Sequence, residues 1–333
     1  MGAMRVLITG ITGFIGQQLA RALHASGCYE LVGVARDRTK APPFEARGIE
    51  MRYADLLDVA SLQDVTRDVD VVMHLAALMD FHASWEQLYR HNVVSTQVIA
   101  RDAMRHGVNH FIYASSTEAV GPVSQVPADE MADCRPVYDY GKTKLLAERW
   151  LHTCYAENGF PVTLLRPTGV YGPGDTYVTL STVRAVANRK LRVLPGGGDC
   201  FVHFTYIDDV VQGFMRALEV PQNAIGKIFT IASDDYYTYR DTFTIIAELL
   251  GVPPPRYSVP LVVGKAFVGV VEWINAWRGI DDFVMHTSVV EDMATNRAYS
   301  NQKAKNQLGF QPTWDLTTGM ETTITGFQDQ GLL

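Results

Sequence analysis

The sequence predicts an α/β protein with a doubly wound parallel sheet and a smaller lobe after it. Three observations support this prediction. A glycine-rich turn joins a short apolar run to a helical segment near the N-terminus, and further apolar runs alternate with helical segments as far as residue 170. Beyond that point, proline and glycine become denser and the alternation is lost, which indicates a lobe of different architecture.

The first strand, turn and helix form a unit suited to binding a diphosphate. Residues 5–9 form a short apolar run, as in a buried parallel strand, and residues 17–24 are good helix formers. A strand that turns through glycines into a helix directs backbone N–H groups and the positive end of the helix at one point. We therefore expect this turn to hold the pyrophosphate of a dinucleotide, through Gly10, Thr12, Gly13, Phe14, Ile15 and Gly16.

The tip of the second strand indicates which dinucleotide binds. Residues 30–35 form a largely apolar run that ends at Arg36-Asp37-Arg38. A carboxylate at this position bonds the adenosine ribose of NAD, whereas arginine accommodates the 2′-phosphate of NADP. The strand tip here is Ala35-Arg36, and the acidic residue, Asp37, comes only after it. We therefore expect NADP, bound with help from Arg36 and Arg38. NAD is the alternative if the arginines belong to a solvated charge run and Asp37 binds the ribose.

Four more strands are expected from short apolar runs, at residues 49–53, 69–75, 110–115 and 162–166. Residues 92–105 are expected to be helical. Strands separated by crossover helices form a parallel sheet that binds its ligand at the carboxyl edge. Residues just after the strand ends are therefore candidates to line a cofactor crevice, with Asp55 and Leu56 facing the adenine and Leu75, Ala76 and Ala77 beside the cofactor.

The loss of alternation after residue 170 suggests how the chain is divided. We expect residues 4–170 to form the dinucleotide-binding domain, with later segments at about 200–235 returning to it. Residues 171–333 are expected to form mainly a substrate lobe that does not fold separately. The sequence has no internal repeat or low-complexity segment.

An apolar stretch in the lobe, Val259 to Trp277, is borderline in length for crossing a bilayer. Lys265, Glu272 and Asn275 lie inside it, and charged residues are costly at the centre of a membrane. We therefore expect a packed helix or an apolar lid over the substrate rather than a membrane span. Peripheral contact with a membrane stays open.

Composition and charge narrow the class of protein. A chain of 333 residues with 47% apolar residues can build a sizeable core. The net charge of −7 and the lack of a long basic block argue against nucleic-acid binding. The four cysteines show neither metal-site nor disulfide spacing, so we expect no metal and a cytoplasmic protein. Residues 5–8 are expected to be a strand rather than part of a signal peptide, and Met4 the natural start.

A tyrosine and a lysine four residues apart provide the candidate chemistry. On a helix, Tyr140 and Lys144 share a face. A neighbouring ammonium lowers the pKa of a phenol, which can then donate a proton to a carbonyl or accept one from an alcohol. Lys144 can also bond the nicotinamide ribose, while Ser116, at the end of the fifth strand, can stabilise charge on the reacting oxygen. Tyr-x-x-x-Lys alone is common on surface helices, but here it follows a glycine turn and a Ser-Ser-Thr strand end.

These motifs resemble those of the extended short-chain dehydrogenase/reductase superfamily, which includes nucleotide-sugar epimerases and dehydratases and 3β-hydroxysteroid dehydrogenases. The likeness runs nearly from end to end, through residues 9–16, 55–56, 74–77, 92, 115–116, 140–144, 166–167 and 204–210. It implies a Rossmann fold, a homodimer and a catalytic trio of Ser116, Tyr140 and Lys144. It also implies that Asn92 is a supporting polar residue, with a role at a helix start as the alternative. The expected cofactor contacts of this motif set are Tyr140, Lys144 and Pro167.

The branch of the superfamily decides the substrate. Nucleotide-sugar enzymes commonly have an asparagine and an arginine where this chain has Gly169 and Val202, and loss of the guanidinium weakens diphosphate binding. Residues 166–175 are instead similar to the 3β-hydroxysteroid dehydrogenase-like branch, and the apolar stretch suits an apolar substrate. The candidate substrate contacts lie at the ends of these segments: Ser116, Thr117, Glu118, Tyr140, Thr168, Gly169 and His203.

Two of these contacts have structural alternatives. Dehydratases of the superfamily have an Asp-Glu pair after the catalytic hydroxyl, whereas this chain has Thr117-Glu118. Dehydration is therefore disfavoured, and Glu118 can instead make a turn contact or cap a helix. His203 can belong to an ordinary packed aromatic element.

The sequence therefore predicts an NADP(H)-dependent oxidoreductase that interconverts a hydroxyl and a carbonyl on a hydrophobic small molecule. Sterol-like, 3-ketoacyl, aldehyde and ketone substrates all fit. One alternative is a nucleotide-sugar epimerase, dehydratase or reductase with bound NAD(P). Another is a sensor or scaffold that binds a dinucleotide without turnover, although the intact trio argues against it.

Overall fold

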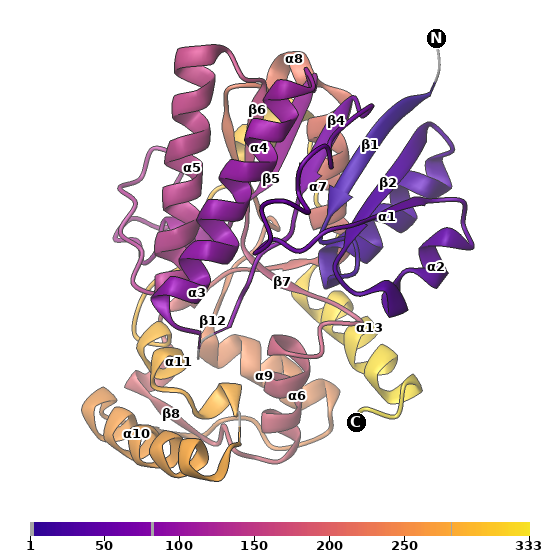
Figure 1. The fold of residues 1–333 in the computed structure, drawn as a ribbon. Coiled ribbons are helices and arrows are strands. Elements are labelled where there is room, and N and C mark those ends of the chain that lie inside the picture. Colours follow the sequence, from indigo (N-terminus) through magenta and orange to yellow (C-terminus); the bar gives the residue numbers. More distant parts are fainter. Residues whose placement is uncertain (1–2, 81–82, 281) are drawn as a thin grey trace.

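The computed structural model describes residues 3–80, 83–280 and 282–333. Seven parallel strands form the central sheet in the order β11-β6-β5-β4-β1-β2-β3 (Figure 1). The chain adds β2 and β3 on one side of β1 and then β4, β5, β6 and β11 on the other. The predicted doubly wound sheet of the Rossmann type is confirmed. Its strands are β1 (Met4–Thr9), β2 (Tyr29–Ala35), β3 (Glu50–Tyr53), β4 (Val71–His74), β5 (His110–Ala114), β6 (Val162–Pro167) and β11 (Ile228–Ile231).

Helices cover both faces of this sheet (Figure 1). One face carries α3 (Trp85–Tyr89), the π-helical turn η2 (Arg90–Val94), α4 (Ser95–Arg105) and α5 (Asp139–Asn158). The other carries α1 (Phe14–Ser26) and α7 (Ile207–Glu219), which pack against each other. In β1, Leu7 belongs to the core under α4 and α5, whereas Val6 and Ile8 belong to the core under α1 and α7. Strands buried on both faces are apolar throughout, which is why they were recognisable in the sequence.

Three short elements connect the strands at the cofactor end of the sheet. They are the 3₁₀ turn η1 (Arg38–Lys40), the short helix α2 (Pro42–Glu45) and the 3₁₀ turn η3 (Thr117–Ala119). Of these, η1 and α2 follow β2, and η3 follows β5. All three therefore lie near the carboxyl edge, where a parallel sheet of this kind binds its ligand.

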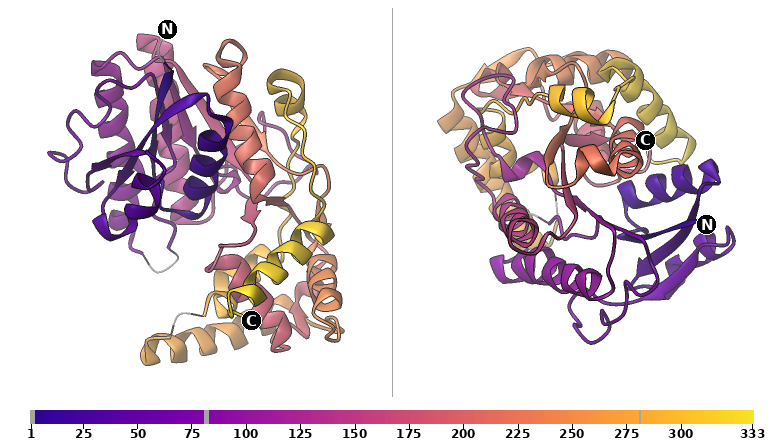
Figure 2. Two further views of the ribbon diagram at one scale, coloured as in Figure 1. Left: turned by 90° about the vertical axis from the view of Figure 1, so that its right-hand side faces the viewer. Right: turned by 90° about the horizontal axis from the view of Figure 1, so that it is seen from above.

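The lobe lies beyond this carboxyl edge and combines three short strand pairs with helices (Figures 1 and 2). Its pairs are β7 (Gly169–Tyr171) with β10 (Phe204–Tyr206), β8 (Val193–Pro195) with β13 (Tyr257–Val259), and β9 (Phe201–Val202) with β12 (Tyr237–Thr238). Its helical elements are α6 (Val178–Ala187), η4 (Gly196–Gly198), α9 (Tyr239–Leu249), α10 (Leu261–Arg278), η5 (Phe283–Met285), α11 (Thr287–Asp292) and α13 (Leu316–Asp329). The two other short helices, α8 (Pro221–Ala224) and α12 (Gln302–Leu308), pack against α7 beside the sheet instead.

The lobe and the sheet share a hydrophobic core. The core under α1 and α7 continues into the lobe, where it includes Val183 of α6, Phe243 of α9 and Phe327 of α13. In addition, α7 packs on the sheet, and β11 pairs with β6 at its edge. The chain therefore crosses between the two parts more than once, which couples the position of the lobe to that of the sheet.

The apolar stretch of the lobe forms α10, but the helix does not pack as expected. Only Gly264 and Val268 of this helix are buried, while Trp273 and Trp277 are 72% and 83% exposed. The expectation of a packed helix is therefore wrong for most of its apolar side chains. None of the helices in the described ranges is long and apolar enough to span a membrane.

Candidate active site

The glycine turn joins β1 to α1 at the carboxyl edge of the sheet. Gly10 has a φ of +71°, and a Cβ at this residue would lie 2.8 Å from the backbone nitrogen of Ala76. A Cβ on Gly16 would lie 2.1 Å from the carbonyl oxygen of Gly10, so the helix packs on the turn only with glycine there. Gly13 caps α1 without a side chain, and no acidic residue lies in the first helical turn. This end of α1 therefore fits the phosphates of a dinucleotide.

The other residues of the turn connect it to its surroundings. The carbonyl of Thr12 accepts a 2.8 Å hydrogen bond from Gln17 Nε2. Ile15 packs against the hydrophobic core, and the ring of Phe14 lies beside Gly172 and Gly174, which follow β7. The turn is thus in contact with the lobe as well as with the sheet.

A buried polar network connects the ends of β1 and β4. Thr9 Oγ1 lies 2.7 Å from His74 Nδ1 and accepts a hydrogen bond from the N–H of Ala76. His74 Nε2 lies 3.0 Å from Thr96 Oγ1. Burial, with a smaller effect of Lys144, lowers the pKa of His74 to about 3, so the ring is neutral at pH 7. The network holds the segment that contains Leu75, Ala76 and Ala77 against the glycine turn.

At the tip of β2, the acidic residue is already engaged. Asp37 Oδ1 accepts hydrogen bonds from the backbone N–H of Thr39 and from its hydroxyl, at 2.9 and 2.6 Å, and so caps η1. Arg36 is exposed, and Arg38 stacks on the ring of Tyr53 with 4.1 Å between its guanidinium carbon and the ring centroid. The guanidinium groups and the second carboxylate oxygen of Asp37 are therefore all exposed to a ligand at this tip.

Asp55 and Leu56 follow β3, at the neighbouring strand end. Asp55 Oδ1 accepts a 2.9 Å hydrogen bond from the backbone N–H of Leu57, so this carboxylate shapes its own turn. Both residues are half-buried. Their position beside the tip of β2 is the one expected for residues near an adenine ring.

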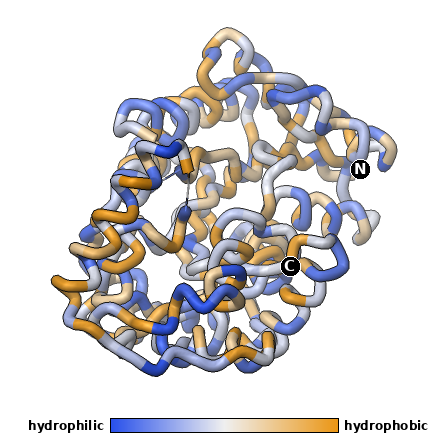
Figure 3. The backbone as a smooth tube through the Cα atoms, turned by 90° about the horizontal axis from the view of Figure 1, so that it is seen from below, coloured by the Kyte–Doolittle hydropathy of each residue, from blue (hydrophilic) through white to orange (hydrophobic). Residues whose placement is uncertain are grey.

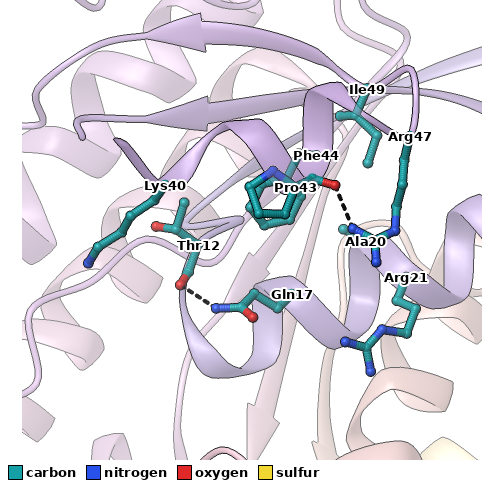
Figure 4. A pocket seen from close by; sticks show the side chains of 9 residues that line it. All are labelled: Thr12, Gln17, Ala20, Arg21, Lys40, Pro43, Phe44, Arg47 and Ile49. Carbon is teal, nitrogen blue, oxygen red and sulfur yellow. Dashed lines mark hydrogen bonds between the residues drawn. The ribbon is translucent and has the colours of Figure 1, made fainter. Parts of the chain in front are cut away.

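A cavity of about 310 Å³ lies on the outer side of the glycine turn, between α1 and α2 (Figure 4). It shares Thr12 with the turn, and three cationic side chains line it: Arg21, Lys40 and Arg47. Arg47 donates a hydrogen bond to the carbonyl of Pro43, which holds α2 at the rim. None of the residues that line this cavity belongs to the predicted catalytic trio, so the cavity is separate from the reacting centre.

Close packing brings the predicted catalytic residues together. Ser116 caps η3 by accepting a 3.1 Å hydrogen bond from the N–H of Glu118. Tyr140 lies in the first turn of α5, and the adjacent Gly141 contacts η3 so closely that a Cβ on it would lie 2.2 Å from the carbonyl of Glu118. Lys144 is buried one turn further along and donates a 2.8 Å hydrogen bond to the carbonyl of Ala114 at the end of β5.

The pKa values of this group differ from the sequence-based expectation. Burial, reinforced by the carboxylate of Glu118, raises the pKa of Tyr140 above its usual value near 10. Burial lowers the pKa of Lys144 to about 7, although Glu148 opposes this shift. The prediction that Lys144 lowers the pKa of Tyr140 is therefore wrong in this geometry, where the amine lies 5.8 Å from the centre of the phenol ring. At pH 7 the phenol keeps its proton.

Asn92 is buried in the π-helical turn η2 and joins three segments. Its Oδ1 accepts a 2.8 Å hydrogen bond from the N–H of Leu78, and its Nδ2 donates to the carbonyl of Leu78 at 3.0 Å and to Thr143 Oγ1 at 3.1 Å. Thr143 Oγ1 in turn donates to the carbonyl of Tyr140. Asn92 therefore lies inside a helical segment and connects the loop after β4 to the turn of α5 that bears Tyr140. Single π-helical turns are frequent at functional sites.

An ion pair that the sequence analysis missed supports α5 behind the site. Glu148, one turn after Lys144, receives two hydrogen bonds from Arg166 on β6, at 2.8 and 2.6 Å. Both side chains are almost fully buried. Arg166 was noted only as part of a motif, and nothing in the sequence identified Glu148 as its partner. The pair anchors α5 to the sheet close to the reacting centre.

A second group missed by the sequence analysis surrounds Glu118. Arg297 is buried and forms ion pairs with Glu118 Oε1 and Asp292 Oδ1, each at 2.7 Å. Tyr138 donates to the same Asp292 oxygen at 2.9 Å. Burial and the nearby carboxylate of Glu118 raise the pKa of Asp292 to about 7, although Arg297 opposes this shift. We refer to these four residues as the Arg297 cluster.

His203, which was predicted to contact the substrate, is bonded within the protein. His203 is buried, its Nε2 bonds to Ser233, and its Nδ1 accepts the N–H of Tyr299, so neither ring nitrogen is available to a substrate. Burial lowers its pKa to about 4. The structure thus corrects the prediction of a substrate contact at this residue. His203 is instead a packed side chain, which was the alternative interpretation.

Thr117 and Thr168 also use their hydroxyl groups within the protein. Thr117 Oγ1 donates to the carbonyl of Pro167 at the end of β6, and Thr168 Oγ1 lies 2.6 Å from Thr205 Oγ1. Both residues are buried, whereas Gly169 is exposed at the start of β7. A Cβ on Gly169 would lie 2.8 Å from the ring of Phe204, so a larger residue does not fit there. The two threonines align strands β6, β7 and β10 beside the site.

The fold and this arrangement define an α/β enzyme that uses a nicotinamide dinucleotide. The model of the NAD dependent epimerase/dehydratase family matches residues 6–232. The chain belongs to this family and, with it, to the extended short-chain dehydrogenase/reductase superfamily. The sequence-based resemblance is confirmed.

Relatives along the whole chain have several activities. The chain is 26% identical to sterol demethylase protein B of Methylococcus capsulatus, covering 99% of this chain and 100% of that protein. It is 25% identical to the human sterol-4-alpha-carboxylate 3-dehydrogenase, decarboxylating, covering 98% and 89%. Among solved structures, gox2253 matches with 25% identity, a TM-score of 0.81 and 98% and 99% coverage. UDP-glucuronic acid 4-epimerase from Bacillus cereus in complex with NAD matches with 23% identity, a TM-score of 0.78 and the same coverage, which shows a shared fold.

Proposed function

We propose that this protein is an NADP(H)-dependent oxidoreductase that interconverts a hydroxyl and a carbonyl group on a hydrophobic small molecule. The observation that supports this most directly is the contact of Gly141 with η3, which brings the helix of Tyr140 and Lys144 against the turn that bears Ser116. A phenol, an amine and a hydroxyl are thereby assembled at the carboxyl edge of the sheet, beyond the glycine turn.

In the proposed reduction, the protein handles the proton and the bound dinucleotide supplies the hydride. Tyr140 Oη donates its proton to the substrate oxygen, which suits a phenol that is protonated at pH 7. Ser116 Oγ bonds the same oxygen and stabilises the charge that develops on it. Lys144, whose amine bonds the carbonyl of Ala114, holds the helix turn that bears Tyr140 at the end of β5. Asn92 acts as a positioning residue through Thr143.

The preference for NADP rests on the tip of β2. One carboxylate oxygen of Asp37 is bonded to Thr39, and Arg36 is exposed at the position where a guanidinium can bond a 2′-phosphate. Lys40, which lines the neighbouring cavity with Thr12, adds a positive charge nearby. In our proposal, Arg36 binds the 2′-phosphate, and Arg38 lines one side of the phosphate-binding site.

The Arg297 cluster favours an apolar substrate over a nucleotide sugar. Arg297 lies beside Val202, the position where nucleotide-sugar enzymes have an arginine, because its backbone pairs with that of β9. Its guanidinium is shared between two carboxylates, so the cluster offers no net positive charge to a diphosphate. The relatives named for sterol substrates agree with this choice. The alternative, a nucleotide-sugar enzyme, is supported by the family model, by the 26% identity to MoeE5 in complex with UDP-glucose and NAD, and by the shared fold of the solved epimerases.

Turnover assays on two classes of substrate test this proposal. The purified protein should oxidise NADPH in the presence of apolar ketones or aldehydes, such as a 3-ketosteroid and a medium-chain 3-ketoacyl ester. Uridine diphosphate should not raise its melting temperature, since ligands that bind the native state stabilise it. Stabilisation by uridine diphosphate together with epimerisation of a UDP-sugar would instead establish the alternative function.

Replacing Arg36 with alanine tests the cofactor preference. The Arg36→Ala variant should bind NADPH about 10- to 100-fold more weakly, because a charge-assisted contact to the 2′-phosphate is lost. Its affinity for NADH should change little, as NADH lacks that phosphate. Titration by the quenching of protein fluorescence measures both affinities. Arg47→Ala, which removes another exposed arginine near the same turn, is the matched control, and an equal loss for the two cofactors would contradict the assignment.

A further inference from the structure

The outer face of α10 is apolar over its whole length. Eight exposed apolar residues of the helix form this face: Val262, Val263, Ala266, Phe267, Val270, Trp273, Ile274 and Trp277. At 3.6 residues per turn these eight positions fall within an arc of about 140°. We refer to this arc as the apolar face of α10. The helix lies at the lower end of the molecule in Figure 1, which is the end turned toward the viewer in Figure 3, where hydrophobic segments of the chain are orange.

Two charged residues in the middle of α10 bond to the neighbouring part of the lobe. Lys265 pairs with Glu291 on α11, and Glu272 bonds His286 Nε2 and the backbone N–H of Thr287. Gly264 packs against Pro195 so closely that a Cβ would lie 2.5 Å from the proline ring. These contacts fix the rotation of the helix about its own axis. The apolar face therefore points away from the body of the lobe, and it cannot turn inward to cover a substrate, as the predicted lid would, without breaking these contacts.

The charges around this helix complement an anionic surface. Within the described part of 256–292, Asp282, Glu291 and Asp292 form ion pairs with lysine or arginine, and Glu272 bonds the ring of His286. By contrast, Arg256 before β13 and Arg278 at the end of α10 are exposed and have no carboxylate partner among the described residues. Arg192, which directly precedes β8 and whose carbonyl accepts the N–H of Arg256, is exposed in the same way. This region thus carries unpaired positive charge in a chain whose net charge is −7.

From these observations we propose that α10 binds to the surface of a lipid bilayer, with its axis in the plane of the membrane. Tryptophan and phenylalanine on one face with arginine at the flanks are typical of helices that lie in the interfacial region. Arg278 lies at the edge of the apolar face next to Trp277, where its guanidinium can contact headgroup phosphates while the indole enters the acyl boundary.

A second copy of the chain is a less suitable partner for this face. The helix has 18 residues and is about 27 Å long, so its outer face covers on the order of 300 Å². A stable interface between proteins buries roughly 800 Å² on each partner. A bilayer requires no complementary shape and can bury such a narrow face by itself.

Membrane binding would also place the site within reach of apolar substrates. The helix is bonded to α11, and Asp292 at the end of α11 belongs to the Arg297 cluster beside Glu118. The membrane-bound face is therefore one helix away from the reacting centre. This consequence rests on the proposed function, but the binding itself does not.

Co-sedimentation with vesicles tests the proposal. Vesicles of equal parts phosphatidylcholine and phosphatidylglycerol should pellet the full-length protein without added cofactor or substrate. The double variant Trp273→Ser/Trp277→Ser should require at least about tenfold more lipid for half-maximal binding, because two large buried rings are lost. Arg256→Ala and Arg278→Ala should weaken binding to these vesicles severalfold and leave binding to pure phosphatidylcholine unchanged.

A matched control and two opposing outcomes complete the experiment. Met131→Ser/Val59→Ser also removes two exposed large apolar side chains, away from α10, and should bind like the wild type. Failure of the wild type to pellet, or equal binding by the tryptophan variant, overturns the proposal. So does a wild-type dimer in solution that becomes monomeric in the tryptophan variant, which would make the apolar face a subunit interface. All of these readouts are independent of turnover.

Discussion

Tyr140→Phe should lower kcat by about 10³-fold while the affinity for NADPH stays within a few-fold of the wild type. The phenol is the proposed donor of the proton to the substrate oxygen, and the variant keeps the ring but removes that proton. The remaining interactions of the site, with Ser116 on η3 and Lys144 bonded to Ala114, do not depend on the hydroxyl. Steady-state kinetics with the most rapidly reduced ketone, together with a cofactor titration, measure both effects.

Tyr155→Phe is the matched control for this prediction. Tyr155 belongs to the same helix but lies on its exposed side, 36% exposed and packed against Gly226. Its variant should retain the activity of the wild type. If Tyr140→Phe kept more than about a tenth of the wild-type kcat, proton donation by Tyr140 would be excluded. If both variants lost activity to the same degree, the loss would be due to a general effect on α5 rather than to the missing proton.

Glu148→Gln should lower the free energy of unfolding by about 3–5 kcal/mol. The carboxylate receives two hydrogen bonds from Arg166, and both side chains are almost fully buried. Glutamine has a similar shape, but its amide cannot neutralise the guanidinium, which would then be a buried charge without a counterion. Urea unfolding followed by far-ultraviolet circular dichroism measures the loss.

The control for Glu148 comes from the same helix. Glu157→Gln alters an exposed glutamate of α5 and should change the stability by less than about 0.5 kcal/mol. A double variant, Glu148→Leu/Arg166→Met, removes both charges together and should recover much of the stability lost in the single variant. A loss below about 1 kcal/mol in Glu148→Gln would show that water or another group compensates for Arg166.

Glu148 also affects the chemistry, because it opposes the effect of burial on Lys144. Without its negative charge, the pKa of Lys144 should fall further below 7, and the amine would be neutral at pH 7. A stabilising ion pair and the protonation of a catalytic side chain therefore depend on the same carboxylate. The sequence offered no sign of this coupling, since Arg166 and Glu148 are on different elements.

The sequence predicted the sheet and the glycine turn well because their determinants are local. A strand buried on both faces must be apolar throughout, so β1, β4 and β5 appear as short apolar runs. A turn with φ of +71° at Gly10 and close packing at Gly16 admits almost no residue but glycine. Helical spacing alone relates Tyr140 to Lys144. These features need no knowledge of distant parts of the chain.

The surroundings of the site could not be predicted in this way. Glu118 and Arg297 are 179 positions apart, and only the folding of the lobe onto the sheet makes them a pair. His203 was predicted to contact a substrate, but Ser233 and Tyr299 occupy its two nitrogens. Burial, which is a property of the folded molecule, raised the pKa of Tyr140 where the local charge of Lys144 was expected to lower it.

By itself, then, the sequence determined the α/β architecture, the dinucleotide turn and the candidate trio, because hydrophobic burial and backbone geometry act on neighbouring residues. The tertiary structure alone decided which charges meet at Glu118 and how burial sets the protonation of Tyr140 and Lys144. It also decided that the apolar residues of α10 point outward, because the polar contacts of Lys265 and Glu272 fix the helix from the other side. Electrostatics and the orientation of a helix depend on partners far along the chain, and the fold alone brings those partners together.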